Sequence, residues 1–189
     1  MNEKIIWDYL IAKIKNEYGV AALMGNLYAE SSLNPVCANN IKKYGLTNAS
    51  YTAIADSGVN NNFVTDKIAY GLAQWCYHTR KKGLLELARK QNKSVGDIEL
   101  QLDYLWTELQ SYKTVVKALY EAKNIKDASD VVLLKYEKPA NKSESVKEKR
   151  ASFGQKYYNM FANTKIKLNL PKNTVDEIIV KLKGEIDAN

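Results

Sequence analysis

The sequence predicts a mainly α fold, in which a helical bundle carries one small β-hairpin between its second and third helices. Apolar residues recur at helical spacing over most of the 189 residues. Residues 36–69 lack this spacing and are rich in asparagine, serine, threonine and glycine. A chain of this length forms one ordinary domain with a hydrophobic core of its own, alone or with a short appendage.

Two helices open the chain. Residues 2–17 place an apolar stripe on one face, formed by Ile6, Tyr9, Leu10 and Ile14. We expect Gly19 to break this run, after which residues 20–31 repeat the pattern with Leu23, Met24 and Leu27. Asn34-Pro35 ends the second helix, because a residue before proline avoids the helical region. The two helices therefore form a hairpin with a short joint.

The next segment, residues 36–69, is expected to be a long loop that holds the β-hairpin. Its apolar stretches are short, at residues 51–55 and 63–64. Ser57-Gly58 and residues 60–62 have the composition of turns. Loops of this length inside compact domains usually have a function.

Helical spacing returns near Trp75. The spacing predicts helices over residues 84–88 and 98–109, and Ser94 and Asp97 are candidate caps before the second of these. Three further helices are predicted, over residues 115–122, 128–136 and 145–161.

The end of the chain has a different composition. Residues 163–173 are typical of a linker, and residues 174–186 can form a small amphipathic helix. We therefore divide the chain into a domain over residues 1–163 and an appendage over residues 164–189, which would connect to another domain or form an oligomer.

Bulk composition excludes some functions. No run of about 18 apolar residues is present, so we expect no membrane insertion. Charges surround Ile5, Ile6 and Trp7, and the first residues therefore lack the pattern of a secretory signal. The net charge of +7 favours polyanions such as nucleic acid, anionic lipid or bacterial wall polymers. Because the lysines are spread along the whole chain, we expect no nucleic-acid partner.

The residues suited to metal or thiol chemistry are few. Cys37 and Cys76 are expected to be free, half-buried thiols, although one disulfide between them is possible. His78 is the only histidine, whereas zinc amidases and peptidases generally need two or more histidine ligands. Cys76 and His78, two apart on a helix, would not face each other. We predict no metal and no cofactor.

Glu30 is the most informative residue. It lies at the C-terminal end of the second predicted helix and is spaced i, i+4, i+7 with Leu23 and Leu27, so it shares their core-facing side. A carboxyl group that is shielded from water at the negative end of a helix tends to keep its proton. Glycoside hydrolysis needs such a group as its general acid. By itself, a glutamate here is more often one that reaches water or pairs with a lysine.

A second motif follows the predicted hairpin. In the stretch from Tyr70 to Trp75, Gly71 would let the backbone approach a ligand closely. Gln74 offers donors and an acceptor to a sugar amide or hydroxyl. Tyr70 and Trp75 offer flat apolar faces on which sugar rings can pack. Each feature alone is weak evidence.

Together these motifs resemble the goose-type lysozyme and lytic transglycosylase superfamily, whose fold is α+β and lysozyme-like. The fuller pattern resembles the phage tail-type lysozyme domain over roughly residues 5–162. Its specific pieces are Glu30-Ser31 and the run from Gly71 to Trp75. The other pieces that fit are Gly25-Asn26, Tyr51-Thr52, Asp56-Ser57-Gly58, Phe63, Asp66, Arg80-Lys81, Tyr136-Glu137-Lys138-Pro139, Arg150 and Tyr157-Tyr158.

The resemblance implies a peptidoglycan glycosidase, an N-acetylmuramidase that cleaves the β-1,4 bond between N-acetylmuramic acid and N-acetylglucosamine. Glu30 would be its general acid, and Asn26, Ser31 and Tyr136 would join Tyr70, Gly71, Gln74 and Trp75 in binding substrate. The partner would be the glycan strands of the bacterial cell wall. Other phage tail or wall-binding domains are possible partners, and the protein would act on the wall from a virion or as a released lysin.

The second carboxylate is less defined. Asp56 and Asp66 lie in the predicted β region and are the candidates, although Asp56 can also be a turn residue and Asp66 can pair with Lys67. A water or the substrate's acetamido group can take that role instead, and a lytic transglycosylase would then release anhydro sugars. A non-catalytic wall-binding module of the same shape is the remaining alternative.

Overall fold

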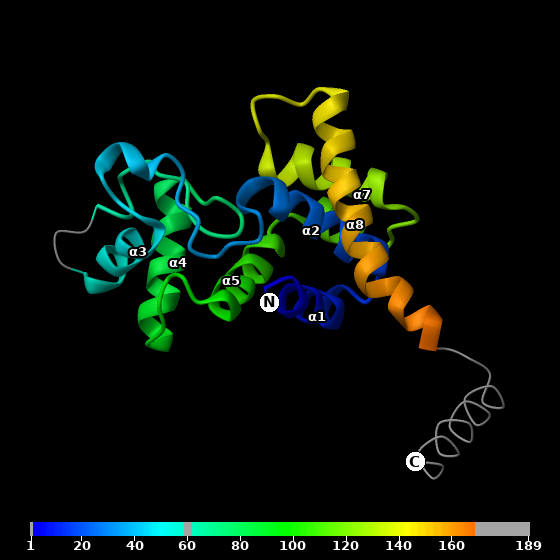
Figure 1. Cartoon of the computed structure of the whole chain (residues 1–189), viewed down its shortest axis with the longest axis horizontal. Coiled ribbons are helices and arrows are strands. Elements are labelled where there is room, and N and C mark those ends of the chain that lie inside the picture. Colours follow the sequence, from blue (N-terminus) through cyan, green and yellow to red (C-terminus); the bar gives the residue numbers. More distant parts are fainter. Residues whose placement is uncertain (1, 59–61, 169–189) are drawn as a thin grey trace, which may run out of the picture.

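The structure, a computed structural model, describes residues 2–58 and 62–168, without the side chains of residues 163–168. Helices dominate this part of the chain, which confirms the mainly α fold (Figure 1). The α-helices are α1 (Asn2–Ile14), α2 (Glu17–Ser31), α3 (Asn48–Ser57), α4 (His78–Gln91), α5 (Ile98–Leu109), α6 (Lys113–Tyr120), α7 (Ile125–Val132) and α8 (Glu144–Leu168). A 3-10 helix, η1 (Ile41–Tyr44), and a π-helix, η2 (Leu133–Glu137), complete them.

Helix α2 is the centre of the larger part of the molecule, here called the helical lobe. Helices α1, α6, α7 and α8 pack around it. The residues from Gly19 to Leu27 are all buried, so α2 has no solvent-exposed face over most of its length. A helix that is apolar all round belongs inside a bundle, and this explains why α2 shows so little amphipathic contrast.

The segment from residue 32 to residue 91 forms the small lobe, with η1, α3 and α4 (Figure 1). The predicted β-hairpin is wrong, because no strand occurs among the residues that the structure describes. Backbone pairing there is limited to isolated bridges of Tyr70 with Ala38 and with Trp75.

Helix α3 replaces the hairpin for a local reason. Thr47 caps it, and the side chains of Thr47 and Ser50 satisfy each other's backbone N–H groups in a capping box. Tyr51 and Ala55, one turn apart, face the core, and Gly58 ends the helix at φ 70°. Ser57-Gly58 is therefore a helix end and not a hairpin turn.

Other boundaries differ from the expected ones at identifiable residues. The joint between α1 and α2 lies at Lys15, which has φ 55°, and not at Gly19. Gly19 lies inside α2, where a Cβ would collide with the backbone of Leu119. Asp97 caps α5 as predicted, with its side chain accepting from the N–H of Leu100.

The last helix is longer than expected. Helix α8 continues to Leu168, past the expected domain end at residue 163. The expected helix over residues 174–186 lies outside the described residues. No helix in the described part of the chain is long and apolar enough to span a membrane.

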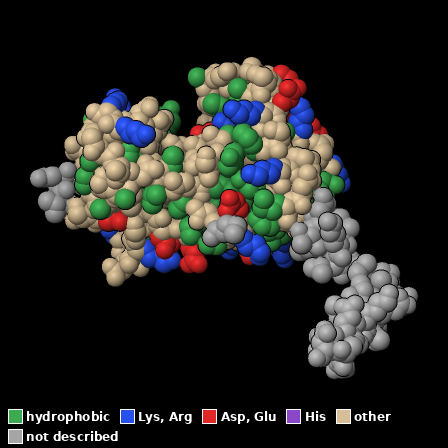
Figure 2. All heavy atoms as spheres, in the orientation of Figure 1, with side chains coloured by type: hydrophobic (Ala, Val, Ile, Leu, Met, Phe, Trp, Pro, Cys, Tyr) green, Lys and Arg blue, Asp and Glu red, His purple; other side chains and the backbone are tan. Residues whose placement is uncertain are grey.

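Helix α5 connects the two lobes, since it packs against α4 on one side and against α1 and α6 on the other. One continuous hydrophobic core runs through both lobes. In Figure 2 the upper surface is hollowed between the small lobe and the part of the helical lobe that carries residues 138–143 and the start of α8. The C-terminal end of α2 lies where the chain crosses from one lobe to the other (Figure 1).

Candidate active site

Glu30 lies in the last turn of α2, next to the crossing between the lobes. Its side chain is 21% exposed, so it is shielded but reachable from solvent. Ser32 and Leu33 follow in the left-handed region, at φ 54° and 58°, and this sharp turn ends the helix directly after Glu30. The predicted position of Glu30 at the end of a core helix is therefore correct.

Arg150 of α8 is the direct partner of Glu30. Its Nη2 lies 2.5 Å from Oε1 of Glu30, and its side chain is 9% exposed. Its Nη1 donates to the backbone oxygen of Asn26 at 3.2 Å. The guanidinium is thus fixed to α2 at two points, and it holds one oxygen of the Glu30 carboxyl group. No donor to the other oxygen, Oε2, is found among the described residues.

Asn26, a predicted substrate-binding residue, is completely buried. Its Nδ2 donates to the backbone oxygen of Ala22 at 3.0 Å and to Oγ of Ser129 at 2.9 Å, and its Oδ1 accepts from Arg150 at 3.4 Å. Asn26 therefore joins α2 to α7 and α8 behind Glu30. In this structure it supports the site and has no surface for a ligand.

Close helix contact explains how Arg150 reaches Glu30. Gly25 of α2 faces Gly154 of α8, and a Cβ on Gly25 would lie 2.5 Å from the nitrogen of Gly154 and collide with the backbone of Arg150. Only a residue without a side chain permits this approach. The glycine pair therefore sets the separation of α2 and α8 at the Glu30–Arg150 contact.

The stretch from Tyr70 to Trp75 is a compact turn before α4, directly beside Ser31. Oγ of Ser31 donates to the backbone oxygen of Leu72 at 2.9 Å, and this bond ties the turn to the end of α2. Gly71 has φ 77°, and the carboxamide of Gln101 fills the space of a Cβ. Nε2 of Gln74 donates to the backbone oxygens of Cys37 and Gly71, at 3.1 and 3.0 Å. These bonds fix the turn beside the C-terminal end of α2.

Tyr70 and Trp75 are both completely buried. The hydroxyl group of Tyr70 lies 2.7 Å from Oγ1 of Thr52. Nε1 of Trp75 donates to Oε2 of Glu108 at 3.0 Å. Neither ring has a face exposed for a sugar in this conformation, and both anchor the turn in the core.

Glu108 is the centre of a buried polar cluster between the lobes. It accepts from Nε and Nη2 of Arg80, at 2.5 and 2.7 Å, and from the hydroxyl group of Tyr136 at 2.6 Å. Burial alone would raise the pKa of Glu108, but Arg80 and the hydrogen bonds of Tyr136 and Trp75 hold it below its ordinary value. Burial also raises the pKa of the Tyr136 hydroxyl, which therefore stays protonated and keeps donating. Tyr136 is only 3% exposed, so here it is a packing residue.

Glu137, which the sequence suggested only as part of a late cleft element with Tyr136, was given no catalytic or binding role there. It ends the π-helix directly after Tyr136, and its Oε1 is buried without a hydrogen-bond partner among the described residues. Burial, followed by the charge of Glu30, raises its pKa to about 8, although Arg80 and Arg150 oppose this shift. The only sequence signal was its place in Tyr136-Glu137-Lys138-Pro139.

Asp56 and Asp66, the predicted second carboxylates, both have structural partners, Asp56 in the loop before α5 and Asp66 within the small lobe. Asp56 accepts from Oγ of Ser94 at 2.6 Å and from the N–H of Val95 at 2.8 Å. Asp66 pairs at 2.6 Å with Nζ of Lys81, which has no exposed surface. Among the described residues, no hydrogen bond or ion pair joins either aspartate to Glu30.

Asp66 has two further donors, which complete its surroundings. The hydroxyl group of Tyr51 lies at 2.6 Å and the N–H of Ile68 at 2.9 Å. Because these bonds and Lys81 compensate the charge of Asp66, its carboxylate is part of a buried network and not a free group.

Among the residues that the structure describes, none of those considered for thiol or metal chemistry has a hydrogen bond or ion pair with Glu30. Cys37 and Cys76 are free and half-buried, as predicted. Burial raises the pKa of the Cys37 thiol, which makes it less reactive. In the described part of the chain, no three side chains among histidine, cysteine, aspartate and glutamate come together as a metal site.

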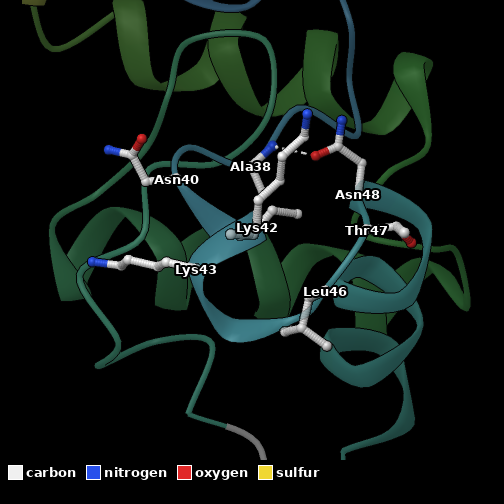
Figure 3. A pocket seen from close by; sticks show the side chains of 8 residues that line it. Ala38, Asn40, Lys42, Lys43, Leu46, Thr47 and Asn48 are labelled. Atoms are coloured by element: carbon white, nitrogen blue, oxygen red, sulfur yellow. Dashed lines mark hydrogen bonds between the residues drawn. The ribbon is translucent and has the colours of Figure 1, made fainter.

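A separate cavity of about 620 Å³ opens in the small lobe (Figure 3). Its lining is Ala38, Asn40, Ile41, Lys42, Lys43, Leu46, Thr47 and Asn48. Lys42 extends alongside Ala38 and Asn48, which a hydrogen bond of 3.1 Å joins, whereas Lys43 points away from them (Figure 3). This cavity contains no carboxyl group, so it offers no acid for the chemistry predicted at Glu30.

The chain was compared with models of protein families and with curated proteins. A family model described as phage tail lysozyme matches residues 1–161, which include Glu30, Glu137 and Arg150. No curated protein matches the chain.

Proposed function

The chain belongs to the phage tail lysozyme family, and on this premise we propose that it is an N-acetylmuramidase with Glu30 as general acid. The family makes it an enzyme that cleaves bacterial peptidoglycan and acts on the cell wall. The bond cleaved would be the β-1,4 link between N-acetylmuramic acid and N-acetylglucosamine, and Glu30 would donate the proton.

The single observation that supports this role is the environment of the Glu30 carboxyl group. Arg150 holds Oε1 at 2.5 Å, the side chain is 21% exposed, and no protein donor is found for Oε2 in the described part of the chain. A general acid needs one oxygen free to meet the substrate and a fixed orientation of the whole group. Glu30 has both.

The chemistry follows from these positions. Protonated Glu30 would donate to the glycosidic oxygen as the bond from C1 to that oxygen breaks, and positive charge would develop at C1. Attack by water at C1 gives a reducing end. Attack by the 6-hydroxyl group of the same sugar gives an anhydro product, and this transglycosylase reaction is the alternative with the same acid.

Glu30→Gln tests the proposal, because the amide keeps the shape of the side chain and cannot donate a carboxyl proton. We expect purified Gram-positive peptidoglycan to be cleaved by the wild type and about 10²–10⁴-fold more slowly by the variant, the usual contribution of a general acid. Mass spectrometry of the products separates reducing ends from anhydro sugars, which are one water lighter.

Glu86→Gln is the matched control. Glu86 lies on α4 with a side chain 62% exposed, and it pairs only loosely with Lys82 at 3.7 Å. This variant is expected to cleave like the wild type. Undiminished cleavage by Glu30→Gln would overturn the assignment of the acid. Wall binding without released fragments by the wild type would instead support a non-catalytic binding module.

A further inference from the structure

The sequence pattern includes Arg150 without giving it a role. Helix α8 brings its backbone against Gly25, where a Cβ would lie 2.4 Å from the backbone oxygen of Arg150. Its side chain is 9% exposed, so little of the guanidinium group can reach a ligand. A charged group that is shielded from water in this way needs partners in the protein, and those of Arg150 lie on α2.

The guanidinium group is divided between two partners. Nη2 lies 2.5 Å from Oε1 of Glu30, and Nη1 donates to the backbone oxygen of Asn26 at 3.2 Å. Asn26 and Glu30 lie one turn apart on α2, so the planar fork of Arg150 spans the last turn of the helix. An ammonium group is a single point and cannot hold both partners in this way. The orientation of the Glu30 carboxyl group is therefore fixed relative to the backbone of its own helix.

The side chain of Asn26 fixes the guanidinium group in turn. Its Nδ2 donates to the backbone oxygen of Ala22 at 3.0 Å and to Oγ of Ser129 at 2.9 Å, which leaves Oδ1 to accept from Arg150 at 3.4 Å. Asn26 and Ser129 have no exposed surface. Helices α2, α7 and α8 thus meet at the group that holds Glu30.

This arrangement distinguishes the two oxygens of Glu30. A guanidinium group has donors and no acceptor, so a proton on Oε1 would face Nη2 with nothing to accept it. The acid form of Glu30 therefore carries its proton on Oε2, for which no donor is found among the described residues. The contact with Arg150 decides which oxygen can give a proton to a substrate.

We propose that Arg150 is a positioning residue for Glu30, which directs the proton to Oε2 and compensates the carboxylate that remains after the transfer. This inference rests on the proposed role of Glu30. The proton passes from Oε2 to the glycosidic oxygen, which also takes the electron pair of the broken bond to C1. Nη2 of Arg150 is already in place for the charge that develops on Glu30. The attacking water or 6-hydroxyl group gives up the proton that restores the acid.

The first test is Arg150→Lys, which keeps the positive charge and loses the fork. We expect kcat on soluble peptidoglycan fragments to fall by about 10- to 100-fold, because a misplaced catalytic group is costly. KM is expected to change by less than about 2-fold, since the interaction is one of the transition state and not of substrate binding. An unchanged kcat would overturn the proposal. A higher KM with kcat unchanged would also overturn it, because Arg150 would then bind substrate.

Arg89→Lys is the matched control, at an exposed arginine of α4, and is expected to cleave like the wild type. The double variant Glu30→Gln with Arg150→Lys is expected to be no slower than Glu30→Gln, because Arg150 acts only through Glu30. A further loss would overturn the positioning role. If Glu30→Gln cleaved normally, the proposed acid would be wrong, and the role of Arg150 with it. Normal cleavage by Arg150→Lys beside a slow Glu30→Gln would overturn the role of Arg150 alone.

The second test needs no activity and uses the intact wild-type chain, which has three arginines, Arg80, Arg89 and Arg150. Nitrogen NMR of their side chains is expected to show slow rotation of the Arg150 guanidinium group in the wild type and faster rotation in Glu30→Gln. Arg80, held by Glu108, should rotate slowly in both proteins, and the exposed Arg89 should rotate fast in both. Fast rotation of Arg150 in the wild type would overturn the proposal even if Arg150→Lys failed to fold.

Discussion

At the scale of single residues, the site depends on how each carboxyl group is compensated. Glu108 has Arg80 and two further donors, Asp66 has Lys81, and Glu30 has Arg150. Glu137 has no such partner among the described residues. The identical side chains of Glu30, Glu108 and Glu137 are therefore suited to different tasks, which only their surroundings distinguish.

Glu137 should make the stability of the fold depend on pH in a specific direction. Its pKa is raised from 4.5 to about 8, so between these values the native state binds more protons than the unfolded state. Its contribution to stability is complete below pH 4.5 and is lost as the pH rises to 8. Urea unfolding at pH 5 and pH 8 is expected to show a larger decrease for the wild type than for Glu137→Gln, by more than about 1 kcal/mol. Equal decreases would contradict the raised pKa.

Asp66→Asn separates a structural from a catalytic role. The amide leaves the buried ammonium group of Lys81 without its counter-charge, and breaking such a pair costs about 3–5 kcal/mol. We expect a lower free energy of unfolding, measured in urea, and a cleavage rate per folded molecule close to that of the wild type. A folded variant with a rate about 100-fold lower would instead return Asp66 to the catalytic residues.

At the scale of elements, the site depends on how closely helices approach. Helices α2 and α8 meet at Gly25 and Gly154, and the same contact places Arg150 against Glu30 and Asn26. The turn from Tyr70 to Trp75 is fixed to α2 through Ser31 and to α5 through Gln101 and Glu108. Several residues predicted to bind sugar thus hold elements in place.

Gly25→Ala tests the helix contact. The added methyl group would collide with the backbone of Arg150 and must push α8 away from α2. Overpacking of this kind costs about 1–3 kcal/mol, and the Arg150–Glu30 pair would be displaced with it. We expect a lower melting temperature together with slower cleavage at a temperature where the variant is folded. Gly45→Ala is the matched control, at a glycine with open space around it and φ 70°. It is expected to lose stability through backbone strain and to leave cleavage per folded molecule unchanged.

At the scale of the whole molecule, two lobes border a hollow, and the chain carries a net charge of +7 (Figure 2). Lysine and arginine are spread over the face seen in Figure 2 and form no single patch. A dispersed positive charge attracts a polyanionic wall over long range and is screened by salt.

Salt should therefore weaken cleavage of whole walls more than cleavage of the glycan itself. Raising sodium chloride from about 0.05 to about 0.5 M shortens the screening distance between charges to a few ångströms. Over this range we expect a several-fold slower clearance of walls that retain anionic polymers. Walls from which these polymers have been stripped serve as control, and their clearance should change less. Equal salt dependence on both substrates would contradict attraction by net charge.

Much of the fold could be predicted from the sequence, because helices have local signals. The apolar spacing identified the helices outside residues 36–69, and Asp97 marked the start of α5. The prediction of a β-hairpin was wrong. The polar composition of residues 36–69 indicated a loop, whereas the capping box at Thr47 and Ser50, which is also a local signal, starts a helix there. The pattern around Glu30 and the run from Gly71 to Trp75 was enough to predict the family, which the match over residues 1–161 confirms.

Sequence by itself determined that Glu30 ends a core helix, since periodicity and the following turn are properties of neighbouring residues. Only the tertiary structure decided which groups surround it. Arg150, the partner of Glu30, lies 120 positions away along the chain, and no local pattern specifies a partner at that separation. Burial likewise depends on packing. For this reason Tyr70 and Trp75, which were expected to offer their rings to a sugar, are core residues in the fold. The charge state of a carboxyl group follows from such distant neighbours and from its shielding from water.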